Sequence, residues 1–198
     1  MKKVKKQSLH QQVKDNFEKS LIFIRESKNY IYFISVIFIL GIIGGFIYSS
    51  QLSFLDEILK NIIQKTTDMN GLELILYIFN NNASVAFSSI VFGILLGLIP
   101  IFYSITNGVI LGYVFSKIYN LSGFSEFWRI LPHGIFELPA IIISMALGLK
   151  LGLFFYSSNT WKEFKQRVMG SFRTFIFVVI PLLVIAALIE GLLITYFR

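Results

Sequence analysis

The sequence has no cysteine among its 198 residues, which excludes disulfides, thiolate metal sites and cysteine nucleophiles. Charged residues are also scarce, at 15% of the chain, whereas a soluble domain usually carries about a quarter. Hydrophobic residues instead make up 55% of the sequence, and the mean hydropathy is +0.71. This composition excludes a water-soluble globular domain and predicts an integral membrane protein.

The net charge of +7 could indicate a nucleic-acid binder, but its distribution argues against that class. Eight of the eighteen Lys and Arg residues precede the first apolar run. Basic residues in that position interact with anionic lipid and set the orientation of a membrane protein. We therefore expect the lipid bilayer and other membrane proteins as partners, and no nucleic acid.

Crossing a bilayer takes about 20 residues of apolar helix. We predict one all-α membrane domain over residues 30–198, a polytopic transmembrane helical bundle. The predicted span 107–119 is short enough to be re-entrant. The prolines Pro132 and Pro139 predict a kink or break in the predicted span 127–156. Pro181 and Glu190 interrupt the predicted span 172–197. The five predicted spans are residues 30–48, 83–104, 107–119, 127–156 and 172–197.

Two other segments are amphipathic rather than uniformly apolar. Residues 1–29 are basic and carry one apolar stripe at helical spacing, so we expect a helix on the membrane surface. A solvated basic tail that only sets topology is the alternative. Residues 51–82 are expected to lie in the membrane interface, because charged side chains line one face of 55–65 and the next apolar piece is too short to span. The stripe in the first segment consists of Leu9, Val13, Phe17, Leu21 and Ile24.

The basic residues also predict the orientation of the chain. The amino-terminal segment and the connector 157–173 together hold twelve Lys and Arg residues. The connector 49–82 holds only Lys60 and Lys65, offset by four acidic residues. The positive-inside rule therefore places the amino terminus and the 157–173 connector in the cytoplasm. Five crossings then put the carboxy terminus outside, in a multi-pass protein of the plasma membrane.

Eight of the fourteen glycines form four G-x-x-x-G pairs, one in each of the first four predicted spans. Such a pair removes two side chains from one helix face, which lets another helix approach closely. We interpret most pairs as internal packing seams, while a homodimer through one seam is a further option. The pairs are Gly41 with Gly45, Gly93 with Gly97, Gly108 with Gly112, and Gly148 with Gly152.

Polar residues within the apolar runs form the candidate site. Asn82, His133, Glu137 and Glu190 all fall in the outer half of the predicted bundle, whereas Asn107 falls near the inner surface. Three interpretations stay open for this cluster: a hydrogen-bond network between helices, a metal or hydrolytic centre, and a proton or solute pathway. His133, Glu137 and Glu190 are the candidate metal ligands, but there is no H-E-x-x-H motif, and we expect no metal or cofactor.

The spacing of these residues resembles the stage II sporulation protein M family. The resemblance runs from about Asn81 to Thr195, and the block Pro132 to Ala140, of the form P-H-G-x-x-E-L-P-A, is its most specific part. Nine further residues contribute to the resemblance: Asn82, Gly93, Gly97, Pro100, Asn107, Gly108, Gly112, Ile189 and Glu190.

The resemblance implies a polytopic membrane protein, with Asn82, Asn107, His133, Glu137 and Glu190 as the polar positions of the family. In endospore-forming bacteria the namesake is a scaffold in a complex with cell-wall hydrolases, but similar proteins occur in archaea and in bacteria that do not sporulate. We therefore expect a scaffold or assembly protein without enzymatic activity. A transporter or channel that uses the polar cluster, and an intramembrane metal-dependent hydrolase, are the alternatives.

Overall fold

The computed structural model describes residues 8–123, 131–156 and 159–196, and these residues form helices and no strand. Five helical stretches are long and apolar enough to cross a membrane. The all-α fold with five crossings is therefore confirmed. The α-helices are α1 (Leu9–Glu26), α2 (Lys28–Ile47), α3 (Leu55–Thr67), α4 (Gly71–Val91), α5 (Leu98–Ser122), α6 (Leu131–Gly152), α7 (Thr160–Thr174) and α8 (Ile180–Tyr196). Short 3-10 turns, η1 (Phe92–Ile94) and η3 (Phe154–Tyr156), follow α4 and α6, and a π-helical segment, η4 (Phe175–Val179), joins α7 to α8.

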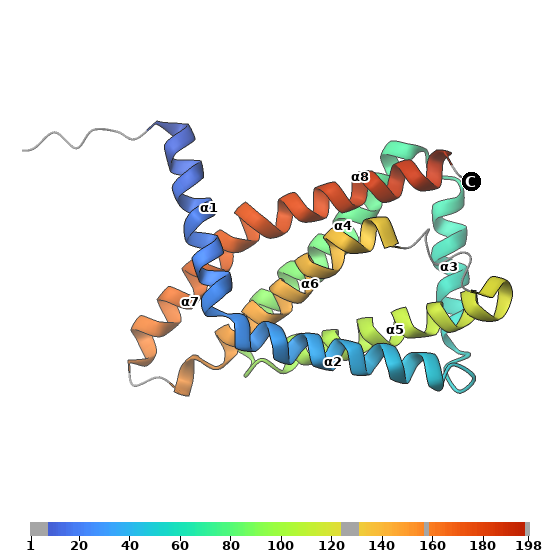
Figure 1. Cartoon of the computed structure of the whole chain (residues 1–198), viewed down its shortest axis with the longest axis horizontal. Coiled ribbons are helices and arrows are strands. Elements are labelled where there is room, and N and C mark those ends of the chain that lie inside the picture. Colours follow the sequence, from blue (N-terminus) through green and yellow to red (C-terminus); the bar gives the residue numbers. More distant parts are fainter. Residues whose placement is uncertain (1–7, 124–130, 157–158, 197–198) are drawn as a thin grey trace, which may run out of the picture.

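The long helices form two groups that diverge from one end of the molecule (Figure 1). Helices α2 and α5 lie side by side as one pair, and α4, α6 and α8 pack together as a bundle. The amphipathic helices α1 and α3 lie across opposite ends of these groups. Helix α1 packs against α7 and leaves Leu9, Val13, Phe17 and Leu21 exposed, as a surface helix requires.

The second crossing begins earlier than the sequence predicts. Asn70 caps α4 through a capping box, in which its side chain accepts a bond from the Glu73 amide and the Glu73 carboxylate accepts one from the Asn70 amide, both at 3.0 Å. The helix then continues without interruption to Val91. The prediction of an interfacial segment over 51–82 is therefore wrong beyond Asp68, because its second half is the first half of a spanning helix.

The boundary between the second and third crossings was also predicted wrongly. The chain turns at Leu96 and Gly97, whose φ angles are 54° and 72°. Gly97 occupies this left-handed region without strain, and α5 starts at the next residue. The predicted spans 83–104 and 107–119 are thus replaced by Gly71–Ile94 and Leu98–Ser122. The second of these has 25 residues and is a full-length crossing rather than a re-entrant one.

Proline affects the last two crossings differently. Pro132 lies in the first turn of α6, where proline is tolerated, and α6 runs through Pro139 to Gly152 without a break. The start of the predicted span 127–156 lies outside the described residues. In the fifth crossing the π-helical segment η4 ends at Val179, and Pro181 is the second residue of α8. A widened turn there relieves the clash between the proline ring and the preceding helical turn, so the helix continues.

The first glycine seam joins α2 to α5. Gly41 faces Gly108, and a Cβ atom added at Gly41 would lie 3.1 Å from the Gly108 Cα atom. A Cβ at Gly45 would collide with the backbone of Val109, and one at Gly112 with the backbone of Ile42. Ser104 adds a hydrogen bond across the same interface, from its hydroxyl to the Ile34 carbonyl at 3.1 Å. These two helices therefore touch through their backbones.

The second glycine seam joins the turn after α4 to α6. A Cβ at Gly93 would collide with Gly148, and a Cβ at Gly152 would collide with the backbones of Gly93 and Gly97. A Cβ at Gly148 would also collide with the Ser89 carbonyl. All four glycine pairs are thus used within one chain, and a homodimer would need a different surface.

Candidate functional site

A cavity of about 380 Å³ lies among α3, α4, α6 and α8, and three of the predicted site residues line it. Asn82 comes from the middle of α4, Glu137 from the second turn of α6 and Glu190 from α8. Gly191, next to Glu190, allows close approach of the two outer helices, because a Cβ there would collide with the Ile75 side chain of α4. Thr66, Tyr77 and Asn81 add further polar groups to the wall.

The three side chains interact with one another at membrane depth. The buried Asn82 and the carboxyl groups of Glu137 and Glu190 line the same small cavity, so the amide and each carboxyl group contribute to one another's electrostatic environment. Asn81 donates a bond from its side-chain Nδ2 to Asn82 Oδ1 at 3.4 Å. The arrangement can share a proton between carboxyl groups or hold them in a hydrogen-bond network.

The two other predicted polar positions do not extend this cluster. Asn107 lies on α5 and donates from its side-chain amide to the Tyr103 carbonyl of its own helix, at 2.8 Å. The backbone of His133 is in the first turn of α6, but its side chain lies outside the described part of the structure. Within the described residues, no three His, Cys, Asp or Glu side chains are grouped closely enough to hold a metal ion.

A second polar cluster, which the sequence analysis missed, connects α3 to α5. Asp56 accepts a hydrogen bond from the Tyr113 hydroxyl at 2.7 Å and an ion-paired bond from the Lys117 ammonium group at 2.9 Å. The Lys117 Nζ atom also lies 5.1 Å from the centre of the Tyr113 ring. Ser116 donates to Ser49 at 2.8 Å and ties the α2–α3 connection to the same helix. We call Asp56, Tyr113 and Lys117 the α3 latch.

The latch stabilises the charged form of its carboxylate. The hydrogen bond from Lys117, followed by that from Tyr113, holds the pKa of Asp56 below its ordinary value. Tyr113 and Lys117 are four residues apart and share a face of α5. That spacing was the available signal, but the sequence alone could not show that the first turn of α3 meets this face.

An apolar groove of about 670 Å³ separates the α2–α5 pair from α6. Of the described side chains that line it, only Ser35 and Glu137 are polar, and Gly134 adds a position without a side chain. Glu137 therefore lies at the boundary between this groove and the polar cavity. The other lining residues are Ile24, Ile31, Leu111, Phe115, Ile135, Leu138, Pro139, Ile142 and Ile143.

Comparison with known proteins connects this architecture to a family. The family model for stage II sporulation protein M matches residues 34–194, so most of α2 and all of α3 belong to the shared region, as well as the part after Asn81. An uncharacterized protein of Methanocaldococcus jannaschii is 30% identical over 181 residues, which covers 83% of this chain and 81% of that protein. No solved structure matches the chain. The match over most of its length shows that this multi-pass membrane protein belongs to the stage II sporulation protein M family.

Proposed function

We propose that this protein is an assembly scaffold that receives a transmembrane helix of another membrane protein in the groove between the α2–α5 pair and α6. The observation that carries the proposal is the groove itself, an apolar cleft with polar groups at membrane depth. Both glycine seams are occupied within the chain, so the groove is where a further helix can enter without displacing an existing contact.

The chemistry of the groove favours a helix over a lipid tail. A lipid tail would leave the Ser35 hydroxyl and the Glu137 carboxyl facing hydrocarbon, which disfavours polar groups. A helix can bring a hydrogen-bond donor to these groups, and the small residues Ser35 and Gly134 allow close backbone approach. The occupant we propose is therefore an apolar helix with a polar donor near its middle.

We further propose that the protein resides in the plasma membrane with its amino terminus and its 157–173 connector in the cytoplasm. The twelve basic residues of these two segments support this orientation. Topology reporters fused at the amino terminus and near residue 165 should both report cytoplasm, and a reporter at the carboxy terminus should report the outside. Both termini on one side would contradict the orientation.

Photo-crosslinking at graded expression levels tests the scaffold. A photoreactive amino acid replaces Ile135, which is exposed in the groove, and the matched control replaces Leu40, which is exposed on α2 and does not line the groove. In membranes of the host cell we expect Ile135, but not Leu40, to crosslink to a second polypeptide. The crosslinked fraction should fall as expression rises, because the partner is then limiting.

Two other outcomes would overturn the proposal. A crosslinked fraction that rises with expression and yields a product of twice the chain mass would identify a second copy of this chain in the groove. Crosslinks to lipid alone, with a yield independent of expression, would identify a lipid-filled groove. A transport role would be supported instead if the Leu40 control gave no crosslink, as expected, and the protein showed a pH-dependent flux that Glu137→Gln removes.

A further inference from the structure

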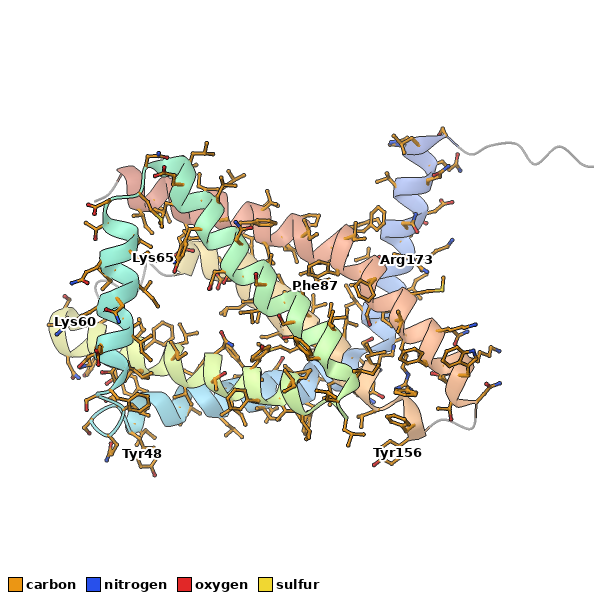
Figure 2. The ribbon with its side chains drawn as sticks, turned by 180° about the vertical axis from the view of Figure 1, so that it is seen from behind. Tyr48, Lys60, Lys65, Phe87, Tyr156 and Arg173 are labelled. Carbon is orange, nitrogen blue, oxygen red and sulfur yellow. The ribbon has the colours of Figure 1, made fainter. Side chains whose placement is uncertain are left out.

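A basic cavity of about 430 Å³ lies between α1 and α7, and it shares no lining residue with the groove of the proposed scaffold. Figure 2 shows Arg173 beside the crossing of these two helices, at the opposite end of the molecule from Lys60 and Lys65 of α3. Four cationic side chains line the cavity against two carboxylates, so its wall is net positive. The cations are Lys19, Lys150, Arg167 and Arg173, and the carboxylates are Glu26 and Glu163.

Lys150 is the most unusual of these residues, because it is only 8% exposed. Its ammonium group donates to the Ser27 hydroxyl at 3.0 Å and lies 3.9 Å from the centre of the Phe23 ring. None of the ion pairs within the described residues includes Lys150. Glu26 and Glu163 act on Lys150 electrostatically but neither forms an ion pair with it among the described residues. A buried cation held by a hydroxyl and a ring face, with no carboxylate in ion-pairing contact, favours an anion at the remaining open side.

The neighbouring arginine is already fixed in place. Arg167 forms an ion pair from its Nε atom to Glu163 at 3.1 Å, and its Nη1 atom donates to the backbone carbonyl of Lys150. Glu163 is therefore engaged by Arg167, and α7 is held against the end of α6. These bonds preorganise the cavity wall while leaving the Lys150 and Arg173 cations to meet a ligand.

We propose that this cavity binds a phosphate group, with Lys150 as the buried contact and Arg173 and Lys19 as additional cations. Lysine supplies a point charge and arginine a planar set of donors, and both bind phosphate through charge-assisted hydrogen bonds. The phosphate can belong to an anionic lipid headgroup or to a soluble anion. Because α1 also exposes an apolar stripe, a lipid headgroup is the source that we test first.

The test uses the full chain, purified in an uncharged maltoside detergent, and follows its melting temperature as ligand is added. One arm adds short-chain phosphatidylglycerol, a second adds phosphatidylcholine of the same chain length, and a third adds inorganic phosphate. The variants are Lys150→Met and Arg173→Gln. The matched control is Lys14→Gln, which removes an exposed cation of α1 that does not line the cavity.

We expect phosphatidylglycerol to raise the melting temperature much more than phosphatidylcholine, because the choline cation offsets the charge of the phosphate in the second lipid. Lys150→Met should require about tenfold more ligand because a charge-assisted bond is lost, and Arg173→Gln about fivefold more. Lys14→Gln should behave like the unmodified chain. If inorganic phosphate alone reproduces this pattern, the phosphate site stands and its ligand is soluble.

The proposal is overturned if no phosphate compound shifts the melting temperature. It is also overturned if Lys14→Gln loses as much affinity as Lys150→Met, because the effect would then reflect net charge. Arg173 is only half-buried, so Arg173→Gln keeps the test decisive if Lys150→Met does not fold.

Discussion

The α2–α5 pair and the α4–α6–α8 bundle are both closed by glycine, but they hold their polar residues in opposite ways. At the α2–α5 pair, the Asp56 carboxylate of the α3 latch faces a lysine and a tyrosine hydroxyl. In the bundle, the two carboxyl groups of Glu137 and Glu190 line one cavity together with the Asn82 amide. The latch is a charge-balanced contact, whereas the bundle places two groups of the same acidic type beside a cavity.

This difference distinguishes contacts that stabilise the fold from residues that are candidates for a functional role. A carboxylate with its own cation is satisfied within the protein, so nothing further is needed to explain it. Two neighbouring carboxyl groups without a described cation disfavour double ionisation, so they are suited to sharing a proton or meeting an outside donor. The comparison therefore directs attention to Glu137, which also borders the groove.

The largest expected effect comes from breaking the seam of the α2–α5 pair. Gly45→Leu should lower the free energy of unfolding by about 3 kcal/mol or more, because even a Cβ at this position collides with the Val109 backbone. Gly44 is the matched control, since a Cβ there meets nothing within 4 Å. Thermal unfolding in detergent measures both variants. Equal losses for Gly44→Leu and Gly45→Leu would contradict the seam.

A smaller effect is expected from altering the carboxyl groups of the bundle. Glu137→Leu should cost about 1–3 kcal/mol because it deprives the buried Asn82 amide of a partner. Glu137→Gln should cost less, since an amide can satisfy the same partner. Melting temperatures of the two variants check this order.

Elemental analysis of the same preparations tests the metal alternative. We expect zinc below one equivalent in the unmodified protein. Zinc binding would need the Glu137 carboxylate and the neutral His133 imidazole as ligands. Stoichiometric zinc that disappears in both Glu137→Gln and His133→Ala would therefore contradict the scaffold proposal and support an intramembrane metalloenzyme.

The smallest effect is expected at the latch and depends on pH. The pKa of Asp56 is lowered in the folded protein, so its contribution to α3 docking is fully present above the ordinary carboxyl pKa. That contribution is lost as the pH falls through the lowered folded-state pKa. The protection of the α3 amides against hydrogen exchange, taken relative to the intrinsic exchange rate at each pH, should therefore fall at acidic pH, and Asp56→Asn should remove most of this dependence. The exposed neighbour Glu57 provides the control Glu57→Gln, and an equal change in both variants would refute the latch.

The sequence predicted the membrane class and the number of crossings, because hydropathy and charge report directly on burial in lipid. It also predicted the amphipathic character of α1 and α3, but it extended the second of these segments too far along the chain. It also singled out Asn82, Glu137 and Glu190, which the fold brings to one cavity. It did not find the boundary at Gly97, since apolar residues lie on both sides of that turn and hydropathy does not change there. The apolar piece that follows Asn70 was predicted to be too short to span, although the capping box at Asn70 begins a spanning helix.

Only the tertiary structure decided which glycine pairs meet and which polar residues become partners. Gly41 meets Gly108, Gly93 meets Gly148, and Asp56 meets Lys117 across 61 residues of sequence. The physical reason is that hydropathy and helical spacing are properties of a single helix. Pairing depends on how the faces of different helices fit when they pack, and in lipid that fit is set by close contact and hydrogen bonding rather than by apolar character.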